Sequence, residues 1–382
     1  MLCYYIFHTI LIINTSFKIK MPVFRLLKPA FISALVFTLP TMAVAQPKVV
    51  ASIKPVHSLV ASVMKGVAEP SLIVKGASSP HDFSLRPSQA KDLAAADVVF
   101  WIGPGLETFL PKSLETIASK AKNVALIESK GLVKLEFREG ATFEGHGDHG
   151  GHSDHDDGDK HEDHAKHDDH DKHDDHDKHD DHDKHDDHDK HDDHDKHDDH
   201  AKHDDHGHGA HAVDPHIFLD PVNAQKMVAT IEKTLSKADP ENAKKYAANA
   251  KELLSELDHL THETEEELEG LKDARFIVFH DAYHYFEARF GIEATGSITL
   301  NPETSPSVSR IKEIRATLDK TNVSCVFSEP QFPTKLVDTV IADTKTKKAT
   351  IDPLGATLEP GAGLYSKLIT NMAASFKGCL GS

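Results

Sequence analysis

The chain has 382 residues, a length that suggests about two domains. Its formal net charge of −18 is concentrated between Gly145 and His211, where 26 acidic residues and 8 lysines together carry −18. The rest of the chain is neutral, so nothing in the charge indicates the basic surface of a nucleic-acid-binding protein, and no nucleic-acid partner is expected.

The N-terminal segment has the composition of an export signal. From Met21 onward, a basic start is followed by an apolar stretch over residues 30–39, and the stretch leads to the small-x-small sequence AVA that ends at Ala45. We therefore predict a signal peptide over residues 1–45, with Met21 as the true initiator and cleavage after Ala45. The apolar stretch is too short for a membrane span, so the mature chain is not expected to cross a membrane.

Short apolar runs alternate with helical patterns between residues 49 and 129. Apolar runs that stop at Gly or Pro predict strands, and apolar residues spaced by three or four after a Pro or Ser predict helices. The expected elements are a strand at 49–53, a helix from Pro55, a strand near 70–76, a helix from about Ser88, a strand at 98–102, a helix at 106–120 and a strand at 123–129. This alternation is typical of βα units around a parallel sheet.

A second alternating block follows a long helical pattern. Residues 241–271 carry apolar residues at helical spacing with one polar turn, and predict a single connecting helix. Strands are then expected at 275–280, 323–330 and 347–355, and helices at 281–291, 305–322, 333–344 and 363–378. We predict an α/β fold with two parallel-sheet lobes, residues 46–240 and 272–382, joined by the long helix.

The charged segment interrupts the first lobe. Residues 145–211 hold 22 of the 30 histidines and almost no apolar residues, so they cannot bury a core, and we predict a disordered insert over 144–212. A His-rich tract indicates metal binding, although a solvated spacer grown by repeat slippage is the alternative. Imidazole suits zinc, copper and nickel, so composition does not choose the metal. The candidate accessory ligands are His146, His149, His152, His155, His173, His176, His179, His182, His208 and His211.

Three histidines lie at the ends of predicted strands or in the loops that follow them. They are His81 in GASSPHDFSLRPS, His216 in DPHIFLDP and His280 in FIVFHDAY, and Asp352 in TIDPLG stands at another strand end. The carboxyl ends of parallel strands are where α/β proteins place ligands. Three imidazoles with a carboxylate or a water would make a tetrahedral site that suits zinc. The alternative for each histidine is an ordinary loop residue.

These stretches, together with VFSEPQF, resemble the periplasmic zinc-binding subunit of zinc ABC importers, the ZnuA type. The resemblance runs from about Lys48 to Cys379 with the motifs in the same order. It implies zinc ligands at His81, His216 and His280 in a cleft between the lobes. It also implies a periplasmic carrier that is not an enzyme, that delivers Zn²⁺ to a membrane permease with a cytoplasmic ATPase, and that we expect to be a monomer.

The fourth ligand is left open by the resemblance. Manganese relatives place a carboxylate where His280 stands, which favours zinc here. Some zinc members have a Glu directly before the first histidine, but this chain has Pro80, so Asp352 or a water must complete the site. Glu329 is a candidate to orient a ligating imidazole, because such imidazoles usually donate their other N–H to a carboxylate. His57 is a second such candidate, with a cap on the helix surface as its alternative.

Cys325 and Cys379 are the two cysteines that remain if translation starts at Met21. Two cysteines in an exported chain suggest one disulfide, and two separate buried thiols are the alternative. The resemblance favours the disulfide, because the family has one in its C-terminal lobe.

Two other functions compete with zinc import. In the first, the His-rich repeat is the main binding element of a zinc-buffering metallochaperone, and the three strand-end histidines do not matter. In the second, the protein is a zinc hydrolase, since three His with a water is also the layout of catalytic zinc. The sequence lacks a motif such as HExxH that would supply the general base.

Overall fold

The computed structural model describes residues 46–138, 140, 142–143 and 212–381, and the chain separates into Met1–Ala45 and a compact unit, Gln46–Ser382. The predicted signal peptide, and the predicted insert with its accessory histidines, lie outside the described residues. The domain boundaries likewise stay predictions.

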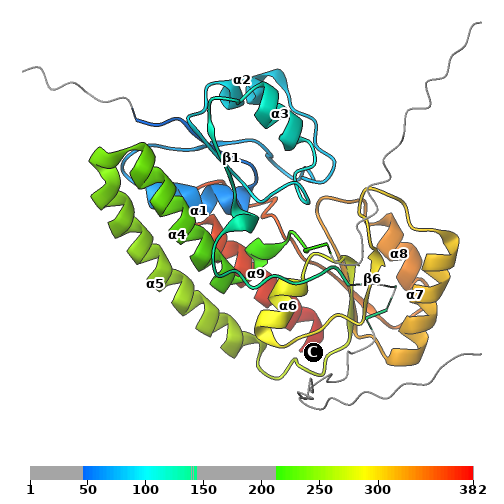
Figure 1. The fold of residues 1–382 in the computed structure, drawn as a ribbon. Coiled ribbons are helices and arrows are strands. Elements are labelled where there is room, and N and C mark those ends of the chain that lie inside the picture. Colours follow the sequence, from blue (N-terminus) through cyan, green and yellow to red (C-terminus); the bar gives the residue numbers. More distant parts are fainter. Residues whose placement is uncertain (1–45, 139, 141, 144–211, 382) are drawn as a thin grey trace, which may run out of the picture. The chain divides into compact units, whose positions relative to one another are not determined.

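Two four-stranded parallel sheets form the framework of the compact unit (Figure 1). The first has the order β2-β1-β3-β4 and is built from β1 (Val49–Ala51), β2 (Ser71–Leu72), β3 (Val98–Trp101) and β4 (Lys122–Ala125). The second has the order β6-β5-β7-β8 and is built from β5 (Phe276–His280), β6 (Gly296–Thr299), β7 (Cys325–Ser328) and β8 (Lys347–Thr350). The two orders correspond strand for strand, and the predicted two-lobed α/β class is confirmed.

Helices connect and cover the strands. The first lobe has α1 (Lys54–Met64), α2 (Pro87–Ala94), α3 (Leu110–Thr116), α4 (Pro221–Ala238) and the 3-10 helices η1 (Leu126–Glu128), η2 (Ile217–Leu219) and η3 (Pro240–Asn242). The remainder has α5 (Ala243–Leu268), α6 (His284–Phe290), α7 (Val308–Thr321), α8 (Lys335–Ile341) and α9 (Leu364–Leu380). None of the described helices is both long and apolar enough to cross a membrane.

The predicted connecting helix is α5, shorter by a few residues at each end. It packs against α4 and α1 and also against α9, so it contacts helices of both lobes (Figure 1). The polar turn in its apolar pattern is bridged by Thr264, which is buried four residues after Leu260 and four before Leu268. The buried stripe is therefore continuous along the helix.

Both faces of the second sheet are covered, and its strands show why. In β5, Phe276 and Val278 belong to the large core shared with α9, while Ile277 and Phe279 belong to a smaller core under α7 and α8. Successive side chains of a strand point to opposite faces, so a fully apolar strand needs a layer on each side.

The predicted disulfide is confirmed. Cys325 in β7 is bonded to Cys379 in α9, with their Cα atoms 6.1 Å apart. The bond ties a central strand of the second sheet to the last helix.

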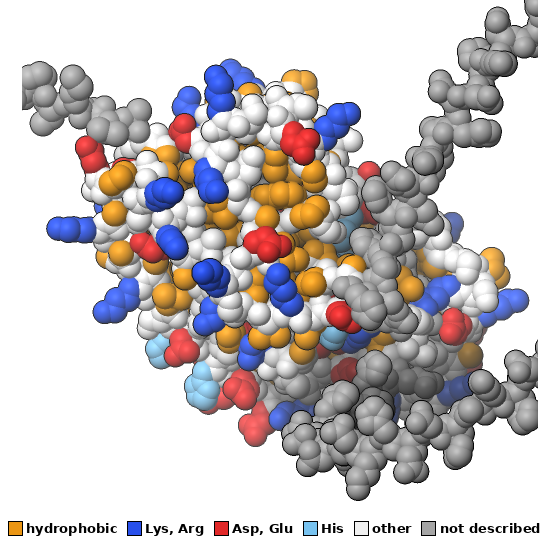
Figure 2. All heavy atoms as spheres, in the orientation of Figure 1, with side chains coloured by type: hydrophobic (Ala, Val, Ile, Leu, Met, Phe, Trp, Pro, Cys, Tyr) orange, Lys and Arg blue, Asp and Glu red, His pale blue; other side chains and the backbone are white. Residues whose placement is uncertain are grey.

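The surface of the described residues fits a neutral folded body. Figure 2 shows basic and acidic side chains interspersed over the visible face, with apolar side chains between them. This mixture agrees with a net charge that resides in the insert alone.

Candidate metal centre

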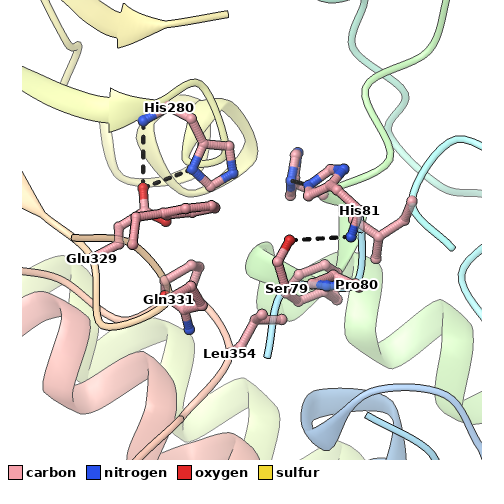
Figure 3. A pocket seen from close by; sticks show the side chains of 12 residues that line it. Ser79, Pro80, His81, His280, Glu329, Gln331 and Leu354 are labelled. Atoms are coloured by element: carbon pink, nitrogen blue, oxygen red, sulfur yellow. Dashed lines mark hydrogen bonds and ion pairs between the residues drawn. The ribbon is translucent and has the colours of Figure 1, made fainter. Parts of the chain in front are cut away.

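The structure brings the three strand-end histidines together. One ring nitrogen from each of His81, His216 and His280 lies within 4.8 Å of the other two, and the Nε2 atoms of His81 and His216 are 3.3 Å apart. The ring centroids are 5.3 to 5.8 Å from one another. His216 and His280 are buried and His81 is half-buried. Figure 3 shows His81 and His280 approaching from opposite sides of one cavity.

Strand register places a carboxylate beside His280. Phe276 of β5 pairs with Cys325 of β7 and Ile277 with Val326, and the same register continued past the end of β7 would bring Glu329 beside His280, whose backbone N–H donates to Glu329 Oε1 at 3.4 Å. Both side chains share the face of Phe276 and Cys325, since side chains alternate along a strand. His280 Nδ1 lies 2.7 Å from Glu329 Oε1 (Figure 3). This distance supports the predicted role of Glu329, which is to orient the His280 imidazole.

The Glu329 carboxylate also raises the pKa of the His280 imidazole. Burial by itself lowers the pKa of His280, but the charge and hydrogen bond of Glu329 outweigh burial, and the net pKa is raised. In the neutral ring, a proton on Nδ1 is donated to Glu329, which leaves the Nε2 lone pair for a metal.

His216 is oriented by a residue that the sequence analysis missed. Asp214 Oδ1 accepts the backbone N–H of His216 at 2.9 Å and lies 2.7 Å from its Nδ1. Asp214 is buried, and its carboxylate closes a short turn over Pro215. The signal was present in the DPH motif, because an Asp two residues before a residue can form this turn.

The location predicted for His216 was wrong in one respect. It does not follow a strand of the parallel sheet. It stands between Val213, which forms an isolated antiparallel bridge with Glu136, and η2. The returning chain pairs locally with the segment before the insert, and this pairing brings His216 to the strand ends of the other two histidines.

His81 lies in the loop after β2. Its backbone N–H donates to Ser79 Oγ at 3.2 Å, and Thr108 Oγ1 donates to its carbonyl at 3.1 Å. Pro80 restricts the backbone immediately before it. Two hydroxyl groups therefore hold the backbone of this loop at His81.

The three imidazoles line a small cavity with apolar walls. The other lining residues are Ser79, Pro80, Leu106, Phe218, Glu329, Gln331, Phe332, Pro353 and Leu354. A dry, shaped wall around a few polar groups is the usual form of a small-ligand site.

Asp352 does not join the imidazole group. Its carboxylate accepts the backbone N–H groups of Leu354 at 3.1 Å and Ala356 at 2.6 Å, and it accepts the Gln331 amide at 3.0 Å. The group of ligand atoms within 4.8 Å contains the three histidines without it. Direct coordination by Asp352 stays a prediction without support from this geometry.

His57 is not the surface cap that was considered as an alternative. It is buried, and its Nε2 lies 3.0 Å from the carbonyl oxygen of Pro70, so this contact ties α1 to the start of β2. Burial is the main reason that its pKa is lowered. Its predicted role in supporting a metal ligand stays a prediction, because the contact of its ring among the described residues is with Pro70 and not with one of the three histidines.

A two-lobed α/β fold with three convergent imidazoles, two of them held by carboxylates, defines a metal-binding protein whose site keeps room for a further ligand. The ZnuA family model, described as zinc-uptake complex component A, periplasmic, matches residues 49–379. The chain belongs to this family. The high-affinity zinc uptake system protein ZnuA of Brucella abortus (strain 2308) is 51% identical over 332 residues, which cover 87% of this chain and 91% of the relative. The protein of that name from Paracoccus denitrificans is 36% identical and covers 88% of this chain and 92% of its own length.

Solved structures show the same fold. A crystal structure of ZnuA matches with a TM-score of 0.63 at 22% identity and covers 88% of this chain and 100% of the solved chain. The substrate-binding protein FpvC from Pseudomonas aeruginosa, solved in complex with Mn²⁺, matches with a TM-score of 0.62 at 19% identity. The match covers 88% of this chain and 99% of the solved chain. The resemblance, and with it the prediction of a zinc-uptake component of the ZnuA type, is confirmed at the level of the family.

Proposed function

We propose that this protein captures Zn²⁺ through His81, His216 and His280 and delivers it to the membrane permease of an ABC importer. The observation that carries the proposal is the convergence of the three ring nitrogens within 4.8 Å. Two of the rings have their Nδ1 atoms engaged by Glu329 and Asp214, so their Nε2 atoms are available to a metal.

The donor set favours zinc over harder cations. Neutral imidazole suits zinc, whereas manganese and magnesium prefer carboxylate and water oxygens. The two nearby carboxylates are already hydrogen-bonded to imidazoles, so they act on the metal through the rings. With Asp352 held by its own loop, we assign the fourth position to a water.

A carrier fits the centre better than a hydrolase. A catalytic zinc also has three protein ligands and a water, but hydrolysis needs a general base beside that water. Asp214 and Glu329 hold the ligands, and the cavity walls are otherwise mostly apolar. Ester hydrolysis by the zinc-loaded protein that disappears in His81→Ala would overturn this choice.

The central experiment is a zinc titration against a competing chelator on protein that lacks residues 145–211. We expect one tight site, and its loss in the double variant His81→Ala/His280→Ala. The matched control is His259→Ala/His262→Ala, because both residues are on α5 outside the imidazole group. The absence of a tight site in the parent would move the function to the His-rich repeat, and a tight site that survives the first double variant would place zinc elsewhere in the folded part of the chain.

The partners and location follow from the proposed transport role. The exported chain, with its signal cleaved after Ala45, would work in the periplasm as a monomer and meet a permease powered by a cytoplasmic ATPase. The mass of the mature protein purified from periplasm tests the cleavage site, and its mass in solution tests the monomer. An N-terminus other than Gln46 contradicts the first.

For the insert we propose the role of a zinc collector. Many weak sites beside one strong site raise the local metal concentration. Deletion of residues 145–211 should reduce zinc uptake at the lowest zinc concentrations that support growth and leave uptake at ample zinc unchanged. Equal uptake at both concentrations contradicts this role.

A further inference from the structure

Gln331 combines two features that the zinc-carrier proposal does not use. It lines the cavity of the three imidazoles (Figure 3), and its Oε1 atom is buried with no hydrogen-bond partner among the described residues. Buried polar atoms nearly always have a partner, and an exception calls for a missing water, ion or ligand. The unpaired oxygen therefore indicates a donor that arrives with the cargo.

The orientation of this amide is decided by its neighbour. Gln331 Nε2 donates to Asp352 Oδ1 at 3.0 Å. The Asp352 carboxylate already accepts two backbone N–H groups, from Leu354 and Ala356, and a carboxylate has no proton to donate. In its hydrogen bond with Gln331, the amide must therefore be the donor. The amide nitrogen must face Asp352, so the oxygen faces away from it.

A metal-bound water supplies the missing donor. Such a water uses a lone pair on the metal and has two O–H groups to donate, so it is stable only where acceptors line the cavity. Glu329 is engaged elsewhere: its Oε1 atom lies 2.7 Å from His280 Nδ1, and a hydrogen bond with the Tyr283 hydroxyl is among the causes that raise the pKa of Tyr283. Gln331 Oε1 is the cavity oxygen that can accept one of the two donors of the water.

We propose that Gln331 determines the fourth position of the metal centre: its Oε1 accepts a hydrogen bond from the water that completes the coordination of zinc. Asp352 is a positioning residue that acts through the Gln331 amide. This inference rests on the proposed zinc site. Of the two fourth ligands left open by the sequence, Asp352 or a water, it takes the water and adds a neutral acceptor for it.

The neutral acceptor also explains how the site avoids harder cations. A carboxylate in this place would add a charged oxygen, which suits manganese. An amide oxygen offers the bound water a hydrogen bond without adding charge to the centre. Replacing Gln331 by Glu should therefore shift the metal preference toward manganese.

The test measures zinc and manganese affinities by chelator competition, with thermal unfolding of the metal-free protein in parallel. In protein lacking residues 145–211, we expect Gln331→Met to weaken zinc binding by about tenfold, as is typical when a partner outside the metal's own ligands is lost. Asp352→Asn should weaken it in the same direction. Gln331→Glu, which keeps the shape, should raise the ratio of manganese to zinc affinity by about tenfold or more.

The matched control is Gln89→Met. Gln89 is a buried glutamine whose amide is satisfied at both ends, by the backbone N–H of Arg86 at 2.7 Å and the carbonyl of Ile73 at 2.7 Å. Its loss should lower the unfolding temperature and leave zinc affinity unchanged, the reverse of the pattern for Gln331→Met.

The outcomes separate this inference from the proposed function. A parent protein with one tight zinc site, whose affinity and metal preference stay the same in all three variants, overturns the role of Gln331 and keeps the carrier. A parent without a tight site overturns both. If Gln331→Met does not fold, Gln331→Glu and Asp352→Asn decide by the metal preference and the zinc affinity.

Discussion

At the scale of single residues, the centre consists of imidazoles that are aimed by carboxylates. His280 is held by Glu329 and His216 by Asp214, each at 2.7 Å from ring nitrogen to oxygen. The backbone of His81 is held by Ser79 and Thr108. His216 and His280 are buried, and their carboxylate partners prearrange these two rings for a metal.

Replacement of the orienting carboxylate should weaken zinc binding. We expect Glu329→Gln to lower zinc affinity by roughly 10- to 100-fold, because an amide oxygen is a weaker acceptor for the Nδ1–H of His280 and no longer strengthens the ring as a ligand. Chelator competition on the purified protein measures the change. Glu256→Gln, on the outer part of α5 where the carboxylate accepts from the Ser366 hydroxyl, is the control and should leave affinity unchanged. Equal losses in the two variants would point to a general effect on folding.

Glu107 makes stability depend on pH. It is fully buried, and burial raises its pKa to about 7, although Ser52 and the backbone N–H groups of Ile102 and Gly103 donate to it. A carboxyl with a raised pKa in the folded state binds its proton more tightly there. The contribution of Glu107 to folding stability is fully present below pH 4.5, the ordinary pKa of its carboxyl group in the unfolded chain. It is lost as the pH rises through about 7, the pKa in the folded state.

This contribution can be measured by denaturant unfolding of the metal-free protein at pH 5 and pH 8. From the shift in pKa we expect Glu107 to cost roughly 3 kcal/mol at the higher pH relative to the lower. Glu107→Gln should lose less stability than the parent between the two pH values. The same loss in both proteins would show that Glu107 does not titrate in this range.

At the scale of elements, the site depends on the ends of β5 and β7 and on what holds them. β7 carries Cys325 at its start and leads into Glu329, while α9 carries Cys379 near its end. The disulfide joins the two elements on the face where Phe327 and Phe376 also pack, with ring centroids 5.0 Å apart. Covalent and apolar contacts thus fix the strand that presents the orienting carboxylate.

Removal of the disulfide should act on stability more than on zinc binding. The bond closes a loop with a sequence separation of 54, for which the chain-entropy relation gives about 4 kcal/mol. We expect Cys325→Ala/Cys379→Ala to lower the free energy of unfolding by about 2 to 4 kcal/mol, because the aromatic packing remains. Zinc affinity of the folded variant should stay within a few-fold of the parent. A larger loss of affinity would show that the apolar contacts do not hold β7 in place.

At the scale of the whole compact unit, hydrogen bonds and ion pairs fasten one lobe to the other. The Lys54 ammonium in α1 donates to the carbonyls of Gly355, Ala356 and Leu358 at 2.8 to 3.0 Å. Tyr365 of α9 donates to the carbonyl of Phe218 at 2.8 Å. Arg138, before the insert, forms buried ion pairs with Asp281 and Glu287, and its guanidinium lies 3.9 Å from the centroid of the Phe143 ring.

Such fastening predicts small movements on metal binding. We expect the radius of gyration of protein lacking residues 145–211 to be the same, within error, with zinc and with a chelator. Small-angle scattering measures it, and the parent treated with zinc and then chelator serves as the reversibility control. A clear decrease with zinc would indicate hinge closure and would contradict the rigid arrangement around α5 and α9.

Residue order along the chain is enough to predict the kinds of element and the chemistry of the ligands. Apolar alternation and helical spacing are local properties, so the βα pattern, the long helix α5 and the three histidines at the loops could all be predicted from residue order. The short strand β6 was missed, because Gly296, Ser297 and Thr299 surround the single large apolar residue Ile298 and give no strand pattern. Helix α6 begins at His284 rather than at Asp281, because Asp281 is held by Arg138 and Ala282 N–H closes a turn onto the His280 carbonyl.

Which polar groups meet at the metal centre depends on contacts between segments that are far apart in the chain. Glu329 reaches His280 from the end of β7, which pairs with β5, and no local pattern encodes the pairing of these two strands. Asp352, a strand-end carboxylate in sequence, is turned to its own loop and to Gln331, and the cavity receives the amide in its place. The identity of a ligand is a property of one residue, but its direction and its partners depend on strands and loops far apart in the chain.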